Sequence, residues 1–332
     1  MSWSWHLLHG RGLRVQRILI IRPGALGDTL MLLPALSDLT GKAAVTFVGR
    51  QPGLEFLRPY VDRAMDLEGS AWHRLFLDPP DGGPLPVSEK DAKIVTAFFS
   101  DPDGVIRRNL KASLPHADVH LFRSFPVEGE PVHVAEYLAR CLACAGLPVD
   151  PVRSIRAARN GALCKRANFT ASGNSIVLHP GSGSLKKNYP PDFWLDLMIR
   201  LSSEASFADL EMVLLMGPAE APLHPHFRDA IEAGAIRSVP SADNETLVRT
   251  LDQAALFLGH DSGVTHLSAM RCVPTVTFFK GSDAAQWAPL GPFVRLIENA
   301  NPGPDLLERI LHASKFLLDV ERSPDRGGVN LG

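Results

Sequence analysis

The sequence predicts an α/β protein with two lobes, each built on a parallel β-sheet that is covered by helices. Short apolar runs alternate with helical patterns along nearly the whole chain, and the second half repeats this rhythm more cleanly than the first. The length of 332 residues suits two lobes of roughly 150 residues each. We expect the first lobe at 17–155, the second at 172–320 and the connection between them near 150–172.

In the first half, strands are predicted where β-branched or aromatic runs are bounded by turn residues, at 17–22, 44–49 and 93–99. Helices are predicted at 28–39, where leucines recur at helical spacing, and at about 132–146. The stretch 69–93 is rich in proline and glycine and is interpreted as a surface loop.

In the second half, strands are predicted at 175–180, 211–217, 255–261 and 274–279, and helices at 191–201, 244–253 and 263–270. Ligands of parallel α/β sheets bind beyond the carboxyl ends of the strands. The loops that follow the strands are therefore the places to look for a site.

Composition narrows the class of protein. Hydrophobic residues make up 45% and charged residues 21% of the chain, and the formal net charge is −2, which argues against a nucleic-acid partner. Four cysteines are too few for a disulfide scaffold, and we interpret Cys141 and Cys144 as small buried apolar residues within a helix.

No apolar run is long enough to span a bilayer, and the N-terminus lacks the features of a signal peptide. Residues 1–16 contain two tryptophans, three leucines and two arginines, and they form either a frayed leader or a contact with a membrane surface. We therefore expect a cytoplasmic protein, with a peripheral position on the cytoplasmic face of the inner membrane as the alternative.

The loop RPGALGD, at 22–28, follows the first strand and opens a helix. Gly24 and Gly27 allow a tight turn and a close approach of the backbone to a ligand. Asp28 has two interpretations: it caps the free amides of the helix, or it acts on a ligand. The loop is not a Walker A motif, because the Lys-Ser/Thr ending is missing.

The loop HPGSGSLKKNYP, at 179–190, combines small donor residues such as Ser182 with Lys186 and Lys187. Exposed amides, hydroxyls and a cation suit a phosphate, although a solvated loop of no function would have the same composition.

Two later loops also follow strands. In LLMGPAEAP, Gly217 precedes Glu220, an acid that either accepts hydrogen bonds from a ribose or complements a helix dipole. In GHDSGVTHLSAM, at 259–270, a helix begins after Asp261-Ser262-Gly263 and carries His266, an arrangement that suits an anion. The alternative for His266 is a buried histidine of the core, and His260 is assigned to packing.

Three segments resemble glycosyltransferase family 9, the ADP-heptose:lipopolysaccharide heptosyltransferases. ILIIRPGALGDTLMLLPAL is similar to the opening strand, Gly-x-x-Gly-Asp loop and helix of that family. HPGSGSLKKNYPPDFWLDLMIRL resembles its entry into the second lobe. LFLGHDSGVTHLSAMRCVPTVTFFKGSDAAQWAPLG resembles its Asp-Ser/Thr-Gly-x-x-His segment and the Pro-Thr strand with a trailing Trp-x-Pro. The resemblance extends over roughly residues 17–297.

The resemblance implies a GT-B fold, in which two Rossmann-like lobes face a central cleft, the first binding the acceptor and the second the nucleotide sugar. It implies an inverting glycosyltransferase that needs neither metal nor cofactor. The expected donor is ADP-heptose, and the expected acceptor is a lipopolysaccharide-core-like or other glycan or glycolipid. The catalytic acid of the motif falls on Asp28, which would be the general base.

On the donor side, the phosphate-contacting lysine of the family falls on Lys187 and its ribose-side acid on Glu220. The resemblance places the diphosphate segment on Asp261, Ser262, Gly263 and His266, and we include Gly27, Ser182 and Gly217 in the predicted donor site.

The sequence departs from the family pattern at two places. Tyr189 replaces the usual tryptophan, and His260 stands where asparagine or threonine is usual before the aspartate. Rival functions are transfer of another sugar, a nucleotide-sugar epimerase or hydrolase, and a binding protein without activity. The donor sugar, the acceptor and the oligomeric state cannot be derived from the residues.

Overall fold

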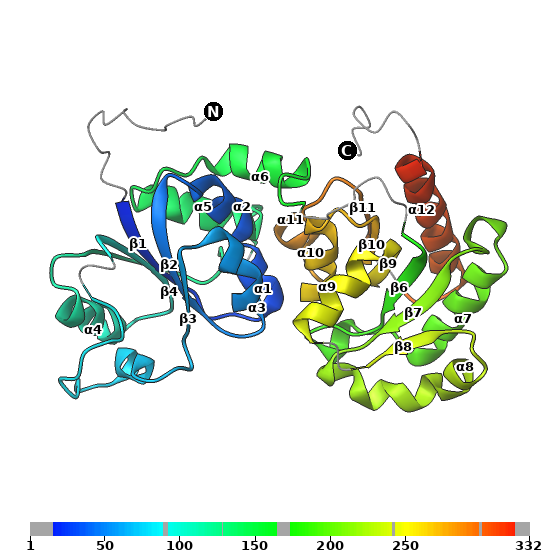
Figure 1. Ribbon diagram of the computed structural model, residues 1–332, viewed down its shortest axis with the longest axis horizontal. Coiled ribbons are helices and arrows are strands. Elements are labelled where there is room, and N and C mark those ends of the chain that lie inside the picture. Colours follow the sequence, from blue (N-terminus) through cyan, green and yellow to red (C-terminus); the bar gives the residue numbers. More distant parts are fainter. Residues whose placement is uncertain are drawn as a thin grey trace, which may run out of the picture.

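The computed structural model describes residues 16–88, 92–127, 129–164, 173–240, 243–298 and 301–322. Two separate β-sheets lie side by side, one in each half of the chain, and helices cover both faces of each (Figure 1). The first sheet has the strand order β3-β2-β1-β4-β5 and the second β11-β10-β9-β6-β7-β8. All strand pairs are parallel, which confirms the predicted class of two parallel α/β lobes.

The predicted strands form the interior of both sheets. They are β1 (Gln16–Ile21), β2 (Ala43–Gly49), β4 (Ile94–Phe98), β6 (Ser175–His179), β7 (Glu211–Leu215), β9 (Ala254–His260) and β10 (Thr275–Phe278). Buried parallel strands read as continuous apolar runs because both of their faces are covered. Four strands were not predicted: β3 (Arg63–Asp66), β5 (Asp118–Phe122), β8 (Arg237–Val239) and β11 (Val294–Ile297). All four are edge strands, which are short and partly exposed and so lack that pattern.

The predicted helix at 28–39 is two helices, α1 (Leu26–Leu30) and α2 (Leu33–Leu39). Pro34 lies in the first turn of α2, where its missing N–H costs nothing, but inside one long helix its ring would clash with the preceding turn. The break separates the loop that carries Asp28 from the helix α2, which is buried in the core.

The stretch 69–93 is not a surface loop, and that interpretation was wrong. It contains the 3₁₀ helix η2 (Trp72–Phe76) and buries four apolar side chains against the first sheet: Trp72, Leu75, Leu85 and Val87. The connection from β3 to β4 has to cover this face together with α4 (Val105–Ser113). Because Trp72 and Leu75 stand within a Pro- and Gly-rich stretch, no periodicity revealed them.

The other face of the first sheet is covered by α1, α2, α3 (Gly53–Leu57) and α5 (Val134–Cys144). Part of the expected connection between the lobes forms another helix, α6 (Pro151–Arg159), which packs on α2 and α5. Residues 165–172 of that connection, and residues 1–15 with the predicted leader, lie outside the described residues. Cys141 is buried as expected, whereas Cys144 is exposed.

The second sheet is covered on one face by α9 (Asn244–Asp252), α10 (Gly263–Met270) and α11 (Ala284–Trp287). The other helices of this lobe are α7 (Pro191–Ser202), α8 (Arg228–Glu232) and α12 (Pro304–Arg322), with the short 3₁₀ helices η3 (Leu185–Lys187) and η5 (Pro218–Phe227).

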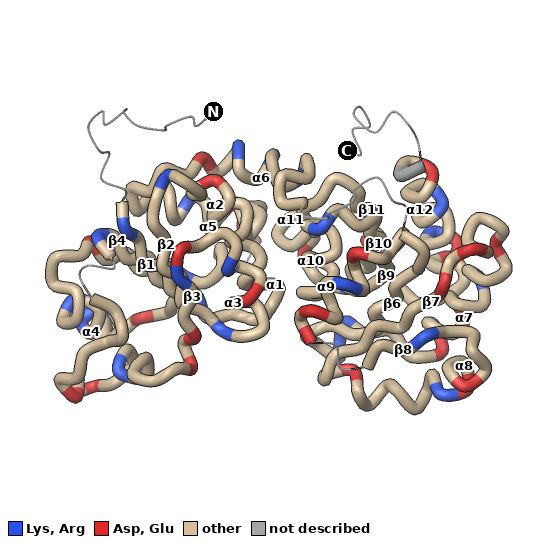
Figure 2. Tube along the Cα trace, in the orientation of Figure 1, with Lys and Arg blue, Asp and Glu red and all other residues tan. Residues whose placement is uncertain are grey.

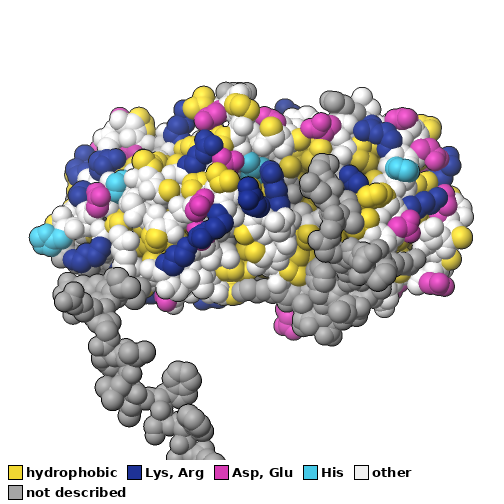
Figure 3. Space-filling model, turned by 90° about the horizontal axis from the view of Figure 1, so that it is seen from above, with side chains coloured by type: hydrophobic (Ala, Val, Ile, Leu, Met, Phe, Trp, Pro, Cys, Tyr) yellow, Lys and Arg dark blue, Asp and Glu magenta, His cyan; other side chains and the backbone are white. Residues whose placement is uncertain are grey.

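Basic and acidic residues intermingle over both lobes (Figure 2), and apolar side chains are scattered among them on the face shown in Figure 3. No helix of the described residues is both long and apolar enough to cross a membrane.

The loop after β5 is joined to the second lobe by two hydrogen bonds. Nδ1 of His133 accepts the N–H of Ala135 (3.2 Å), so the ring proton lies on Nε2, which donates to the carbonyl of Ala288 (2.8 Å). Nearby, the side-chain amide of Gln286 donates to the carbonyl of Glu130 (2.9 Å). Burial lowers the pKa of His133 from 6.5 to about 4, so the ring is neutral at physiological pH.

We predict that His133 makes the fold less stable in mild acid. Between about pH 6.5 and pH 4, the imidazole of His133 is protonated in the unfolded chain but stays neutral in the folded chain. The free energy of unfolding should therefore fall across that window, by at most about 1.4 kcal/mol per pH unit from this residue. In His133→Gln, which keeps an N–H donor for Ala288 but does not titrate, denaturant unfolding at pH 7, 6 and 5 should show a weaker dependence. Equal slopes in the two proteins would contradict the assignment.

Candidate active site between the two lobes

Asp28 lies at the start of α1, beyond the carboxyl end of β1, with its side chain folded back over the loop. The N-cap of the helix is Ala25, and Asp28 is the third helical residue. Its Oδ2 atom accepts the N–H of Ala25 (3.0 Å), so Asp28 satisfies a free amide from within the helix rather than as the N-cap. A side chain at Gly24 would meet the Cβ of Asp28 at 2.7 Å, so this turn requires glycine. Oδ1 accepts no hydrogen bond from the described residues and remains available for a proton.

Lys187 and Asp261 come from different loops and form an ion pair, with 2.6 Å between Nζ and Oδ2. On the other side, Nε2 of the buried His266 lies 3.5 Å from Oδ1 of Asp261. Burial alone would raise the pKa of Asp261, but hydrogen bonds from His266 and Lys187 hold it below its usual range. The loops after β6 and β9 therefore converge on one charged cluster.

The start of α10 has free backbone amides of the kind that bind anions. Ser262 is the N-cap, and its hydroxyl accepts the N–H of Thr265 (3.3 Å) and contacts the hydroxyl of Thr265 (3.0 Å). The side chain of Ser262 thus shapes the turn. Nδ1 of His266 is buried without a hydrogen-bond partner among the described residues.

The hydroxyl of Ser182 organises the loop after β6. It lies 2.7 Å from the side-chain oxygen of Asn188 and 2.9 Å from the carbonyl oxygen of Ser184, and it also accepts the N–H of Ser184 (3.3 Å). Sequence reasoning did not find Asn188, which has no motif signature. This network holds η3 and the backbone of Lys187 beside the end of the sheet.

Glu220 is buried at the start of η5, and its Oε2 atom accepts the N–H of Gly217 (2.8 Å). The carboxylate lies against the loop after β6, because a side chain at Gly181 would overlap it. His179, buried beside it, has a lowered pKa because burial outweighs the attraction of Glu220. Glu220 therefore stands where the loops after β6 and β7 meet.

The two lobes touch at Gly27 and Gly263, where α1 packs on α10. A Cβ atom at Gly263 would lie 2.8 Å from the backbone nitrogen of Gly27 and 2.8 Å from Cβ of Leu26. A Cβ atom at Gly27 would lie 3.3 Å from the ring of His266. The loop of Asp28 is therefore held directly against the start of α10, and both glycines are needed for this approach.

The two departures from the family pattern contact each other. The N–H of Tyr189 donates to Nε2 of His260 (3.1 Å), and the two rings meet edge to face with centroids 4.5 Å apart. His260 is fully buried among Tyr189, Trp194 and Phe278, and burial lowers its pKa to about 3. The packing role predicted for His260 is confirmed, and it is neutral.

Two residues around the contact of the lobes were not among the predicted site residues, although both stand in the motif segments. Arg22, the first residue of RPGALGD, is fully buried beneath the loop of Asp28. Trp287 packs against Phe125 of the first lobe (centroids 5.6 Å apart) and faces His266 (6.3 Å). Its ring therefore spans from the first lobe to α10.

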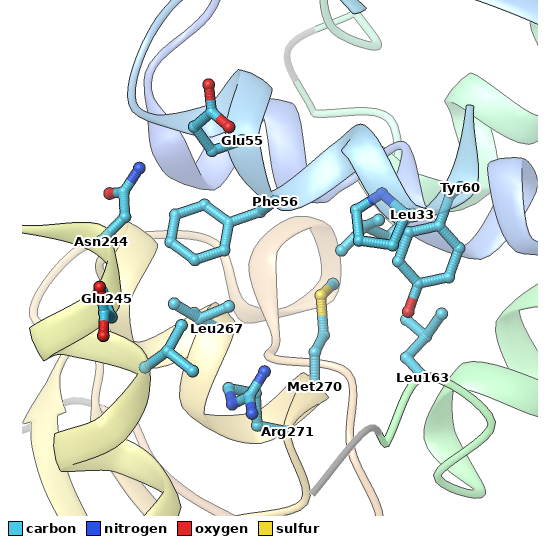
Figure 4. A pocket seen from close by; sticks show the side chains of 12 residues that line it. Leu33, Glu55, Phe56, Tyr60, Leu163, Asn244, Glu245, Leu267, Met270 and Arg271 are labelled. Carbon is cyan, nitrogen blue, oxygen red and sulfur yellow. The ribbon is translucent and has the colours of Figure 1, made fainter. Parts of the chain in front are cut away.

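A cavity of about 320 Å³ also lies between the lobes, but none of the predicted site residues lines it (Figure 4). It is mostly apolar and opens between α3 and the helices α9 and α10, with Phe56, Tyr60, Asn244, Leu267 and Met270 in its walls. Glu55, Glu245 and Arg271 also line it, whereas the charged cluster of Lys187, Asp261 and His266 lies on the loops and the helix start that follow β6 and β9. Among the described residues, no cluster of three or more His, Cys, Asp or Glu side chains could hold a metal ion.

Two parallel α/β lobes whose strand-end loops meet across an interface define the GT-B class. The chain belongs to glycosyltransferase family 9 (heptosyltransferase), whose sequence profile matches residues 108–309. It is therefore an enzyme of that family, as the motifs predicted. The matched range includes Lys187, Glu220 and the segment 261–266, whereas the loop at 22–28 lies before it.

Solved structures support the fold. The E. coli heptosyltransferase WaaC, solved with ADP, has a TM-score of 0.64 at 16% identity and covers 90% of this chain and 100% of its own. The E. coli ADP-heptose lps heptosyltransferase II has a TM-score of 0.63 at 16% identity, covering 93% and 100%. The UDP-GlcNAc 2-epimerase of Methanocaldococcus jannaschii has a TM-score of 0.50 at 13% identity, covering 92% and 94%. No curated protein matches this chain.

We predict that Gly263→Ala disturbs the contact between the lobes. The added methyl group would overlap Gly27 and Leu26, and overpacking of this kind costs about 1–3 kcal/mol. The variant should melt at a lower temperature and scatter X-rays as a larger particle. Gly183→Ala is the matched control, because a methyl group there meets no atom within 4 Å. If the two variants behave alike, the contact between the lobes does not require glycine at position 263.

Proposed function

We propose that this chain is an inverting, metal-independent glycosyltransferase that moves a heptose from ADP-heptose to a lipopolysaccharide-core-like or other glycan acceptor. The observation that carries the proposal is the contact of Gly27 with Gly263 and His266, which sets the loop of Asp28 against the start of α10. A proton acceptor of one lobe thereby faces an anion-binding helix end of the other. The ADP bound to WaaC and the donor in the name of the second E. coli enzyme support the choice of nucleotide.

The second lobe holds the donor. The diphosphate binds between Lys187 and the amides at the start of α10, where a cation and a helix dipole both favour negative charge. Lys187 already pairs with Asp261, so the donor shares this lysine with the acid. Ser182 and Gly27 line the phosphates through their loops, and Gly217 and Glu220 take the ribose.

The first lobe holds the acceptor, and its role is to remove a proton. Asp28 accepts the proton of the attacking hydroxyl as the bond to the anomeric carbon forms. The nucleoside diphosphate departs from the opposite face of the sugar, so the anomeric configuration inverts. Lys187 and the α10 dipole stabilise the charge of the leaving group, which is the task that a metal ion performs elsewhere. The lobe contact limits access of water to the donor.

Asp28→Asn tests the base. Asparagine retains the size of the side chain and an oxygen for the N–H of Ala25, but it cannot take the proton. Transfer should fall by at least roughly 100-fold, while the dissociation constant of ADP stays near that of the wild type.

The wild-type rate should persist in EDTA, and a rate restored only by added Mg²⁺ would refute metal independence. Without an acceptor, epimerisation or release of the sugar would indicate a different reaction.

Lys187→Ala tests the diphosphate site, with Lys186→Ala as its control on the next residue. Loss of a charged hydrogen bond costs about 1.5–3 kcal/mol, so Lys187→Ala should weaken ADP binding by roughly 10- to 100-fold. Lys186→Ala should change it little, because the structure gives Lys186 no ion pair with a described residue. Calorimetry on Lys187→Ala, Asp261→Asn and the double variant should show changes in ADP affinity that are not additive, since both groups belong to one network. Equal losses from Lys186 and Lys187 would point to general attraction and not to a site.

A further inference from the structure

Arg22 carries a buried charge that is not one of the groups used in the proposed reaction. Its side chain is fully buried at the carboxyl end of β1. A guanidinium loses much solvation free energy in such a place, and cores seldom hold one without a partner. Burial accordingly lowers the pKa of Arg22 to about 10, although the nearby charge of Asp28 opposes this, and the group stays cationic at neutral pH.

The contacts of Arg22 all lead to the loops at the end of the first sheet. Nε donates to the backbone carbonyl of Asp28 (3.2 Å), and Nη1 donates to the carbonyl of Ser124 (2.7 Å) in the loop after β5. The guanidinium lies over the rings of Phe98 (5.4 Å) and Phe125 (5.3 Å). The planar fork therefore ties the first turn of α1 to the loop that reaches the second lobe.

The direction of these bonds decides what Arg22 can do. Within the described part of the chain it donates no hydrogen bond to a carboxylate, so it leaves both oxygens of Asp28 to Ala25 and to a substrate. The hydrogen bond from Nε fixes the backbone of Asp28. The guanidinium also places a positive charge near the carboxylate of Asp28, which is partly buried. Two cation–π contacts and hydrogen bonds to two separate backbone carbonyls limit its own motion.

We propose that Arg22 is the positioning residue of the general base: it holds the first turn of α1 so that the carboxylate of Asp28 faces the cleft, and it provides the nearby positive charge that accompanies that carboxylate. The inference rests on the proposed function for its catalytic consequence, but the placement of α1 can be measured without any activity. Arg22 touches no group assigned to the donor, so its effect belongs to turnover and not to donor binding.

The test compares Arg22→Gln, Arg22→Lys and, as a control, Arg107→Gln. Arg107 lies on α4 and also donates to a backbone carbonyl of the first lobe, that of Val119 (3.1 Å), but it makes no hydrogen bond to Asp28 among the described residues. In Arg22→Gln, kcat should fall roughly 10- to 100-fold, the loss expected for a charged hydrogen bond, while KM for the donor stays within about twofold. Arg22→Lys, which restores the charge, should recover part of the rate, and Arg107→Gln should resemble the wild type.

Hydrogen exchange of the amides at 26–32, measured with thermal melting of each protein, gives the second readout. Arg22→Gln should exchange faster there than elsewhere in the first lobe, whereas Arg107→Gln should not. Unchanged kcat and unchanged exchange in Arg22→Gln would overturn the proposal. It would also be overturned if Arg22→Gln and Arg22→Lys lost activity equally and their melting temperatures fell to the same extent. If the wild type transfers no sugar, the proposed function fails, and the exchange at 26–32 alone then decides whether Arg22 positions Asp28.

Discussion

The start of α1 lies against the start of α10 with no side chain between the two backbones, and the arrangement of the whole site depends on that approach. Gly27 and Gly263 make it possible, since a Cβ atom on the latter would overlap the nitrogen of the former. Helix starts carry positive partial charge, and at the start of α1 the carboxylate of Asp28, which accepts the N–H of Ala25, offsets it. The same contact places Gly27, the chain neighbour of Asp28, against Gly263 and the ring of His266.

The charged groups of the second lobe hold one another in place. Lys187, Asp261 and His266 form one network in which the acid is ionised and the lysine is already placed. In the proposed function, this preorganisation lowers the cost of ordering the long side chain of Lys187 around the donor. It also means that the lysine is not a free cation, so its affinity for an anion reflects a competition with Asp261.

Buried histidines and aromatic rings give the surroundings of the site their rigidity. His260 packs among Tyr189, Trp194 and Phe278, and the exchange of a usual tryptophan for Tyr189 accompanies an unusual histidine at the position it touches. The smaller ring and the histidine fill one space together and share a hydrogen bond. On the opposite side of the site, Phe125 and Trp287 meet between the lobes, and the hydrogen bonds of His133 and Gln286 hold the two surrounding loops together.

The sequence alone determined the class of fold, the interior strands of both sheets and the loops in which the site residues stand. It could do so because buried parallel strands are continuous apolar runs and because motif residues follow them directly along the chain. It did not determine the four edge strands, the helix break before Pro34 or the packing of Trp72, since these depend on which face a segment covers. Only the tertiary structure decided that Lys187 pairs with Asp261, that Gly27 meets Gly263 and that Arg22 lies buried beneath Asp28. Each of these contacts joins segments that are far apart in the chain or turns a side chain toward the interior, and neither property leaves a local pattern in the residues.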